Sequence, residues 1–409
     1  MKKVVIVNAH WSNRGDEAAL RPLVNYIMDN YKDIELHIVF KEKEEVTSFP
    51  KWDNIVMHSC KFLPSNTFEV LCAVKSNGKI NIKKNANLRK MIEILCDADV
   101  IIYSPGGSVI CNRFWWKKQL EYLVPFMCAK KYRIPMVVAS PSIGPFENSM
   151  LKKRILKKYL SVPQPLCVRE NISRGYLEKL NIEENVITTI DSAFYDDMNE
   201  TDNAILWDDY SDLKDFMSKY NKVVGMTISD FSWHVAYSKD DCIKENIETT
   251  IGKFIDYLAQ NNVGVILIPQ LFLFQNDKDI LRKYMRSNTC ILSDEYDTYF
   301  QQYIISKLYA VVGMRYHCNI FAAKVGTPFI AISYEEKMQG FMETWELDNY
   351  LINISELSEK KLLEKWQELS DSYKTYKEIL IQHREQWRRL AGMTMESVGQ
   401  VIDMRIIEK

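Results

Sequence analysis

Short runs of β-branched and aliphatic residues recur along most of the chain. Examples are VVIVNA at 4–9, KVVGMTIS at 222–229 and LYAVVGMR at 308–315. These runs are continuously apolar rather than alternating, which is typical of parallel strands buried on both faces of a sheet. Segments with helical spacing, such as 16–31 and 248–262, lie between the runs. The pattern predicts an α/β protein made of βαβ units.

The alternation of strand and helix is interrupted by an acidic segment at 195–217. It carries eight acidic side chains and no strand-like run. We predict a domain boundary here, with Rossmann-like domains over 1–205 and 218–350 that face one another across a cleft. The alternative is an acidic surface loop within a single domain.

The tail at 351–409 has helical patterning and few strand signals. We expect C-terminal helices that pack on the body of the protein. Trp366, Trp387, Arg388 and Arg389 leave a second interpretation open, in which the tail makes a peripheral contact with a membrane surface.

Composition excludes several classes of protein. The chain has 409 residues, with 53 Lys and Arg against 54 Asp and Glu, for a net charge of −1. Duplex nucleic-acid binding usually needs a basic excess, so we expect no nucleic-acid partner. The 47% hydrophobic content is enough for packed cores and excludes general disorder.

No apolar run is long enough for a membrane span, and the start MKKVVIVNAHW is too short in its apolar part for a signal peptide. The nine cysteines are scattered, and none forms a Cys-x-x-Cys pair. Free thiols in a reducing cytoplasm explain them better than disulfides or zinc.

Ligands of parallel sheets bind at the carboxyl ends of the strands, so the loops that follow the apolar runs are informative. The first such loop contains Asn13, Gly15, Asp16 and Glu17. Gly15 permits a tight turn, and the two carboxylates suit the start of a helix. They would repel a pyrophosphate, and the loop has no Gly-x-Gly-x-x-Gly, so we expect it to bind a hydroxyl-rich ligand instead.

Two further loops consist of small residues. Gly106 and Gly107 follow the run DVIIY, and Ser142 and Gly144 follow IPMVVA. Small residues at strand ends let a backbone approach a ligand closely, or simply form a turn. Because the two loops follow neighbouring strands, we interpret them together as one ligand-facing edge.

The loop after LYAVV carries Gly313, Arg315 and His317. A guanidinium recognises phosphate or carboxylate, and an imidazole moves a proton near neutral pH. Arg169, after the short run LCV, is a second candidate anion ligand or an ordinary ion-pair partner of Glu170. Asp191 ends another strand run and either caps a helix or lines the cleft.

These motifs follow one another in a definite order. They are Asn13-x-Gly15-Asp16-Glu17, Ser104-Pro105-Gly106-Gly107, Ser142-Ile143-Gly144-Pro145, Val168-Arg169-Glu170-x-x-Ser173, Asp191-x-Ala193-Phe194, and Gly313-x-Arg315-x-His317 with Ala322-Ala323 and Gly326-Thr327-Pro328. The ordered set resembles the polysaccharide pyruvyl transferase family over residues 4–335. The least similar parts are 41–95 and the tail beyond 350.

The resemblance implies a GT-B-like pair of Rossmann-like domains, with the acceptor sugar on the first and phosphoenolpyruvate on the second. It implies transfer of pyruvate to a sugar as a ketal, in capsule or exopolysaccharide assembly in the cytoplasm or at the inner face of the membrane. The acceptor is a lipid-linked or nucleotide-linked glycan. No cofactor besides the co-substrate phosphoenolpyruvate, and no metal, is implied.

The family's basic cleft residues fall on Arg169, Arg315 and His317. Phosphoenolpyruvate carries a phosphate and a carboxylate, which suits two arginines. His317 would deliver a proton and Asp16 would accept one from a sugar hydroxyl, while the remaining loop residues bind substrate. For Asp16 a capping role fits equally well.

Two other functions remain open at this point. One is a GT-B glycosyltransferase that uses a nucleotide sugar, with Glu335 or Glu336 near the ribose. The other is a carbohydrate-binding protein of a polysaccharide locus without catalytic activity. The acceptor sugar and the oligomeric state are not encoded in any recognisable pattern.

Overall fold

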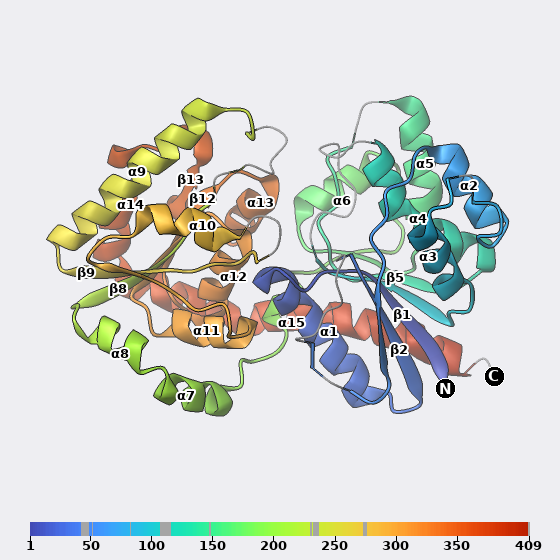
Figure 1. The fold of residues 1–409 in the computed structure, drawn as a ribbon, viewed down its shortest axis with the longest axis horizontal. Helices are drawn as coiled ribbons and strands as arrows, with labels where there is room; N and C mark the ends of the chain where they lie inside the picture. Colours follow the sequence, from blue (N-terminus) through green and yellow to red (C-terminus); the bar gives the residue numbers. More distant parts are fainter. Residues whose placement is uncertain are drawn as a thin grey trace. The chain divides into compact units, whose positions relative to one another are not determined.

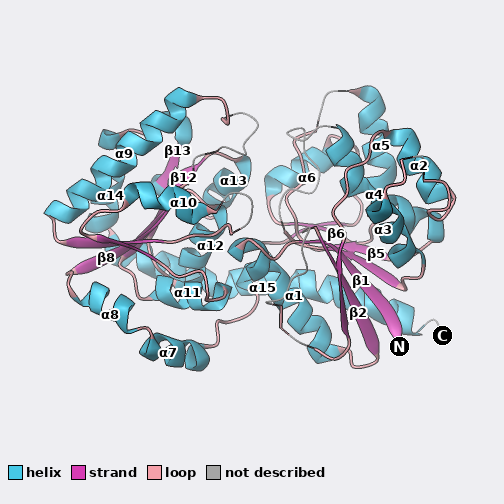
Figure 2. Cartoon of the chain, viewed as in Figure 1, coloured by secondary structure: helices cyan, strands magenta, loops and turns pink. Residues whose placement is uncertain are grey.

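The computed structural model describes residues 1–41, 49, 50, 52–81, 83–106, 116–146, 149–229, 231, 237–272 and 276–407. The chain forms two compact units. The first comprises Met1–Trp11, Ala19–Tyr195 and Arg389–Lys409, and the second Ser12–Ala18 and Asp196–Arg388. In each unit helices flank a parallel sheet (Figure 2). The predicted α/β class, with two parallel sheets and a helical C-terminus, is confirmed.

The first unit contains a seven-stranded sheet with the order β3-β2-β1-β4-β5-β6-β7. Its strands are β1 (Lys2–Ala9), β2 (Ile34–Phe40), β3 (Ile55–Ser59), β4 (Val100–Tyr103), β5 (Met136–Val138), β6 (Leu166–Val168) and β7 (Val186–Thr188). Its helices are α1 (Arg14–Asn30), α2 (Thr67–Lys75), α3 (Ala86–Cys96), α4 (Trp116–Tyr132), α5 (Met150–Leu160), α6 (Asn171–Glu178) and the short η1 (Ser192–Phe194).

Strand β1 shows why the apolar runs are continuous. Successive side chains of a strand point to opposite faces of the sheet. Val5 and Val7 pack into a core with α2, α3 and α4, whereas Val4 and Ile6 pack into a second core with α1 and the C-terminal helix (Figure 1). Both faces of β1 are therefore buried over Val4–Val7, which explains why this run is continuously apolar.

The second unit contains a six-stranded parallel sheet with the order β10-β9-β8-β11-β12-β13. Its strands are β8 (Lys222–Thr227), β9 (Val263–Leu267), β10 (Thr289–Ile291), β11 (Ala310–Gly313), β12 (Phe329–Ser333) and β13 (Leu351–Asn353). Its helices are α7 (Glu200–Asp209), α8 (Ser211–Ser218), α9 (Asp241–Gln260), α10 (Asp277–Leu281), α11 (Thr298–Ser306), α12 (Tyr316–Val325), α13 (Glu336–Thr344), α14 (Glu359–Asp371) and α15 (Tyr373–Ile407), with the short η2 (Arg282–Tyr284), η3 (Asp348–Tyr350) and η4 (Ile354–Glu356).

The acidic segment predicted to hold the boundary contains α7 and α8, and the chain passes from the first unit to the second at Tyr195 and Asp196. Two pieces of chain depart from a simple division by sequence order. Residues 12–18 belong to the second unit, and residues 389–409 return to the first. Helix α1 therefore begins in one unit and continues in the other, as does α15.

Three aromatic residues of the tail are buried, namely Trp366, Tyr376 and Trp387. Trp366 packs edge-on against Phe254, and Trp387 lies against Phe341 and Trp345. Tyr376 donates a hydrogen bond from its hydroxyl to the carbonyl of Phe329 (3.0 Å). None of the helices described has the length and apolar character that a bilayer span requires.

Candidate active site

The second unit has its topological switch point between β8 and β11. On one side of β8 the next strands are β9 and β10, and on the other side they are β11, β12 and β13. Ligands of open α/β sheets bind where the strand order reverses in this way, at the carboxyl ends of the strands. Thr227 ends β8 and Gly313 ends β11, and the backbone N–H of Arg315 donates to Thr227 Oγ1 (3.1 Å). The Arg315 loop therefore lies at the switch point of its sheet.

Arg315 occupies the N-cap position of α12, where the positive end of the helix dipole favours an anion. Its guanidinium is largely buried and forms an ion pair with Asp277 through Nη2. Burial alone lowers the pKa of Arg315, but the negative charge of Asp277 and the contact with the Tyr334 hydroxyl outweigh it, so the pKa is raised. The guanidinium is thus charged and held in one orientation at the start of the helix.

Asp277, which the sequence reasoning missed, fixes this arrangement. Its side chain is buried, and Oδ2 accepts hydrogen bonds from the backbone N–H groups of Gln270 (3.0 Å) and Leu271 (3.1 Å), while Oδ1 faces Arg315. One carboxylate therefore connects the loop after β9 to the arginine after β11. From the sequence, an acid after Asn276 at a helix start is indistinguishable from an ordinary cap.

The segment from Ser12 to Ala18 is held by the same loop. Asn13 forms an antiparallel bridge with Leu271, and the backbone N–H of Arg14 donates to the carbonyl of Gln270 (2.9 Å). Asn13 Oδ1 accepts from the N–H of Gly15 (2.8 Å) and so caps α1. Because of these contacts, a segment that follows the first strand of the first unit packs with the second unit.

Glu17 is a predicted substrate-binding residue, and in the structure its side chain is buried and paired. Its carboxylate is 1% exposed, pairs with Arg14 Nη1 through Oε2 (2.7 Å) and accepts the backbone N–H of Thr298 through Oε1 (3.3 Å). Arg14 also donates to the carbonyl of Asp294 (2.8 Å). Glu17 therefore stabilises the segment internally.

Gly15 lies against His317. A Cβ atom placed on Gly15 would be 1.9 Å from Nδ1 of His317 and 2.1 Å from its Cγ, which no real side chain could tolerate. Gly15 does not have the left-handed φ of a turn glycine, so close approach rather than turn geometry requires this residue. The structure thus brings together two motifs that are far apart in the sequence.

Asp16 lies beside this contact and is partly exposed. Asn13, rather than Asp16, supplies the capping oxygen, and Asp16 forms no hydrogen bond or ion pair with any described residue. Its carboxylate is therefore available in the first turn of α1.

Gly313 is a second position that excludes a side chain. A Cβ there would be 2.0 Å from Asn319 Oδ1, and Asn319 donates from Nδ2 to the carbonyl of Gly313 (3.0 Å). This contact holds the end of β11 against the first turns of α12. Gly313 therefore shapes the loop through packing, and its backbone carbonyl is already used.

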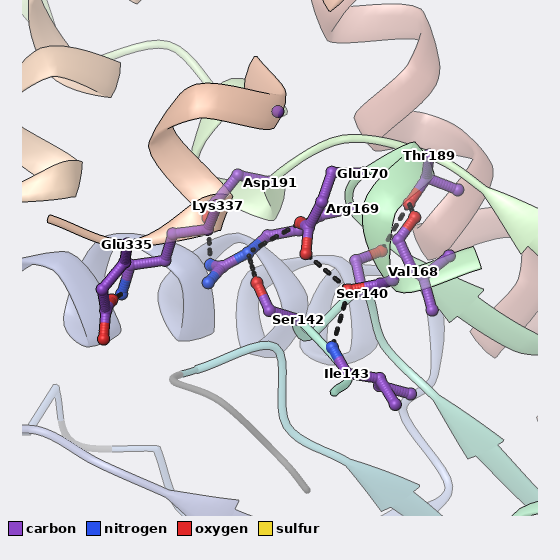
Figure 3. Close-up of polar contacts among 12 residues, drawn as sticks. Ser140, Ser142, Ile143, Val168, Arg169, Glu170, Thr189, Asp191, Glu335 and Lys337 are labelled. Carbon is purple, nitrogen blue, oxygen red and sulfur yellow. Dashed lines mark hydrogen bonds and ion pairs between the residues drawn. The ribbon is translucent and has the colours of Figure 1, made fainter. Parts of the chain in front are cut away.

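In the first unit, Arg169 is the centre of a buried network (Figure 3). Its Nη1 donates to Asp191 Oδ2 (2.7 Å), its Nε donates to Ser142 Oγ (2.7 Å), and the carboxylate of Glu170 lies 3.4 Å away. The Arg169 side chain is 0% exposed. Asp191 also accepts the backbone N–H of Ala193 (3.0 Å), so the network joins the ends of β5, β6 and β7.

The same edge carries hydroxyl groups and strained backbone. Ser140 hydrogen-bonds to Thr189 (2.7 Å) and Thr394, and it has a positive φ of 54°. Gly144 has a φ of 92°, and a Cβ there would collide with the ring of Tyr176, so this position does need glycine.

The other small-residue loop is only partly described. Gly106 is buried beyond the end of β4. Gly107, which we also expected to bind substrate, lies outside the described residues. The switch point of this sheet is between β1 and β4, so the Gly106 loop follows one of its two strands.

A buried lysine follows β2, and no sequence signal marked it. Lys41 Nζ lies 2.9 Å from Glu121 Oε1 and 3.7 Å from the ring centre of Tyr122. Glu121 pairs in addition with Lys118 (2.7 Å). Burial lowers the pKa of Lys41 to about 7, although the charge of Glu121 acts in the opposite direction.

Two hollows of the first unit lie away from these loops. One, of about 550 Å³, is lined by residues that include Lys2, Asp33 and Asp99, and another, of about 380 Å³, lies between Leu160 and Asn185. Both are formed by residues that precede or begin strands, at the amino ends of the sheet. In the described ranges, no group of three or more His, Cys, Asp or Glu side chains could hold a metal ion.

Comparison with solved structures identifies the class of fold. A glycosyltransferase from Rickettsia africae superimposes with a TM-score of 0.58 at 11% identity, over 99% of each chain. A UDP-GlcNAc 2-epimerase from Neisseria meningitidis gives a TM-score of 0.56 at 12% identity, over 98% of this chain and 100% of the other. The fold is therefore of the GT-B-like class, with two Rossmann-like units.

Sequence comparison then identifies the family. The polysaccharide pyruvyl transferase model matches residues 13–336, and the chain belongs to that family. The amylovoran biosynthesis protein AmsJ of Erwinia amylovora is 21% identical over 441 residues, covering 98% of this chain and 100% of that protein. The resemblance inferred from the ordered motifs is confirmed.

Proposed function

We propose that this protein transfers the pyruvyl group of phosphoenolpyruvate to two hydroxyls of a sugar as a ketal, during assembly of a cell-surface polysaccharide. Membership of the pyruvyl transferase family supports the reaction class. The similarity to AmsJ, which is named for amylovoran biosynthesis, supports a polysaccharide as the product. The glycan acceptor is a lipid-linked or nucleotide-linked intermediate.

The observation that carries the proposal is the convergence of His317, Arg315 and the Gly15–Asp16 turn. The proposed anion site is the N-terminus of α12, where Arg315 supplies positive charge at the positive end of the helix dipole. Asp277 balances part of that charge and keeps the guanidinium in place.

The reaction requires proton movements in two directions. A proton is added to C3 of phosphoenolpyruvate, which leaves oxocarbenium character at C2. One sugar hydroxyl bonds to C2 and gives up its proton, and the second hydroxyl then bonds to C2 as the C2–O bond to phosphate breaks. The products are the ketal and inorganic phosphate, which carries away the second proton.

The geometry suits particular residues to these steps. His317, held by Gly15 at the start of α12, is the proposed proton donor to C3. Asp16, partly exposed in the adjoining turn, is the proposed acceptor of the hydroxyl proton. Arg315 binds the phosphate or carboxylate of the donor.

The first unit supplies the acceptor side in this proposal. Arg169 is buried and neutralised by two carboxylates, so we assign it a positioning role rather than direct contact with the donor. It holds Ser142 and Asp191 at neighbouring strand ends, where Gly106 and Gly144 shape the loops of the first unit. In the second unit Asn13 and Gly313 shape the loops near His317.

The test is a transfer assay with the purified full-length protein and a panel of methyl hexosides. Phosphate release and acceptor mass are followed with phosphoenolpyruvate or with nucleotide sugars as donor. We expect phosphate release with phosphoenolpyruvate and a pyruvyl mass gain. Gain of a hexose from a nucleotide sugar would instead make the protein a glycosyltransferase.

Two variants test the residue roles. His317→Ala should lose most of kcat, by on the order of 10²–10⁴-fold for a lost general acid. The Asp16→Asn variant should lose activity, whereas the denaturant concentration at its unfolding midpoint should not change. If the folded Asp16→Asn variant kept full activity, Asp16 would not be the proton acceptor. Its role would then be limited to a favourable interaction with the N-terminus of α1.

A further inference from the structure

Helix α5 of the first unit presents an unusual outward face. Its sequence, MLKKRILKKYL, contains five basic residues and no acidic residue. Its core-facing side chains are Leu156, Tyr159 and Leu160. Because successive helical residues are about 100° apart, one set of side chains projects from the opposite side. These side chains, all exposed, are Met150, Leu151, Arg154, Lys157 and Lys158.

Large apolar side chains are exposed at the beginning of this helix and of a second one. Met150 is 72% exposed, Leu151 is 69% exposed, and Phe68 at the start of α2 is 67% exposed. Single exposed apolar residues are common on soluble proteins and need no explanation. Several in one place are uncommon and mark interaction sites.

Trp116 at the start of α4 connects the two helices. Its Nε1 donates to Thr67 Oγ1 (3.0 Å), and Lys152 Nζ lies 5.3 Å from its ring centre. Thr67 adjoins Phe68, and Lys152 adjoins Leu151, so the exposed apolar residues of α2 and α5 belong to one area. Figure 1 shows α2, α4 and α5 side by side at the edge of the first unit, in agreement with their contacts.

We propose that this area docks on an anionic lipid surface. We call it the α5 patch, and its residues are Phe68, Trp116, Met150, Leu151, Arg154, Lys157 and Lys158. Lysine and arginine are attracted to anionic headgroups, while apolar side chains on the same face enter the boundary of the acyl region. Aromatic rings such as that of Trp116 suit the interfacial depth.

The charge of the α5 patch distinguishes a lipid surface from other occupants. A second copy of this chain would bring the same basic face against itself, which like-charge repulsion opposes. The buried centre of a protein interface is depleted of lysine. A nucleic acid would contact the basic side chains, but it would not account for the exposed apolar side chains of Met150 and Leu151. An anionic bilayer interface uses both properties on one helix face.

The α5 patch lies outside the candidate active site and does not depend on the identity of the donor. It also differs from the tail residues considered for membrane contact, since Trp366 and Trp387 are buried. Docking through α5 would keep the first unit at the surface on which lipid-linked glycans are assembled.

The experiment is cosedimentation of the full-length protein with vesicles. One set consists of phosphatidylcholine, and the other of equal parts of phosphatidylcholine and phosphatidylglycerol. We expect binding only to the anionic vesicles, and weaker binding as salt is raised. Arg154→Gln/Lys157→Gln/Lys158→Gln should weaken binding at least about tenfold, and Met150→Ser/Leu151→Ser several-fold.

The matched control is Lys374→Gln/Lys377→Gln on the exposed side of α15, which should bind as the unaltered protein does. Circular dichroism establishes that each variant is folded. Equal binding to both kinds of vesicle, binding that survives both α5 variants, or no binding at all would overturn the proposal. So would sedimentation equilibrium that showed a dimer abolished by the α5 variants, because a second copy would then occupy the patch.

Discussion

The backbone of Gly15 lies directly against the imidazole ring of His317, and the space between them is too small for a single methyl group. Gly15 belongs to the first turn of α1, and His317 belongs to the first turn of α12. Two helix starts therefore meet at the carboxyl edge of the second sheet. The imidazole can hold its place only because Gly15 has no side chain.

Replacing Gly15 by alanine should displace His317 without unfolding the protein. We expect kcat to fall by on the order of 10²-fold, since a misplacement of about 1 Å at a reacting group has that effect. The measurement is steady-state turnover beside a thermal unfolding curve.

Gly175→Ala is the matched control for this prediction. A Cβ at Gly175 in α6 would have nothing within 4 Å. This variant should keep full activity and gain about 0.5–1 kcal/mol in stability, because alanine is the better helix former. Normal turnover of Gly15→Ala would show that the position of His317 does not matter for activity.

Asp277→Asn should both destabilise the second unit and weaken donor binding. The substitution removes the negative charge of Asp277 that is paired with the buried guanidinium of Arg315, at a cost of about 3–5 kcal/mol. The KM for the donor should rise, because Arg315 is no longer held at the start of α12. Urea denaturation and steady-state kinetics measure the two effects.

The same helix provides the control for Asp277. Asp279, also in α10, is 71% exposed and pairs with the exposed Arg282. Asp279→Asn should change stability by less than about 1 kcal/mol. Equal effects of the two substitutions would mean that the Asp277–Arg315 pair has no special importance.

Asp191→Asn tests the buried network of the first unit. Arg169 would lose the carboxylate that contacts its Nη1, so we expect a loss of about 3 kcal/mol in unfolding free energy. Asp197→Asn is the control, since its pair with Arg388 is exposed and should contribute less than about 1 kcal/mol. If Arg169 were instead a direct donor ligand, Asp191→Asn would lower the donor KM.

The Lys41–Glu121 pair should respond unequally to the loss of each partner. Glu121→Gln leaves Lys41 buried with no carboxylate, at a cost of about 3–5 kcal/mol. Lys41→Met leaves Glu121 with its second partner Lys118, so we expect a loss below about 2 kcal/mol. Chemical denaturation of the two variants decides this, and the reverse order would disprove the assignment.

The lowered pKa of Lys41 makes a prediction about pH. Its pKa is about 7 in the folded protein, against 10.5 when it is unperturbed. Between these values the unfolded chain binds more protons than the folded one, so the contribution of Lys41 to stability rises with pH.

The measurement is the difference in unfolding free energy between the unaltered protein and Lys41→Met. From pH 7 upward, the unaltered protein should become more stable relative to Lys41→Met, by at most about 1.4 kcal/mol per pH unit. A difference that stays constant up to pH 10 would show that Lys41 titrates normally.

Several features of the site could be predicted from the sequence. Arg315 and His317 follow a buried strand. An arginine and a histidine at the end of such a strand are hard to explain by packing, which favours a functional role. The strands themselves were predictable because burial on both faces demands continuous apolar runs, as in β1. The order of the motifs identified the family.

Other features could not be predicted, because they depend on contacts between distant residues. Asp277 and Lys41 are single charged residues, and nothing in their neighbourhood in the sequence shows that they are buried. Gly15 was expected to form a turn, whereas it is required for close approach to His317. Ligand binding by Glu17 and Arg169 stays a prediction, and no local pattern showed that both side chains form buried ion pairs within the fold.

By itself, the sequence determined the class of fold, the positions of the strands and the loops that carry polar side chains. These properties are local, since the periodicity of apolar residues records which faces of each element are buried. The tertiary structure decided which loops meet, that residues 12–18 pack with the second sheet, and which charges are neutralised by a partner. Those properties arise from packing between segments far apart in the chain, and no local pattern encodes the partner.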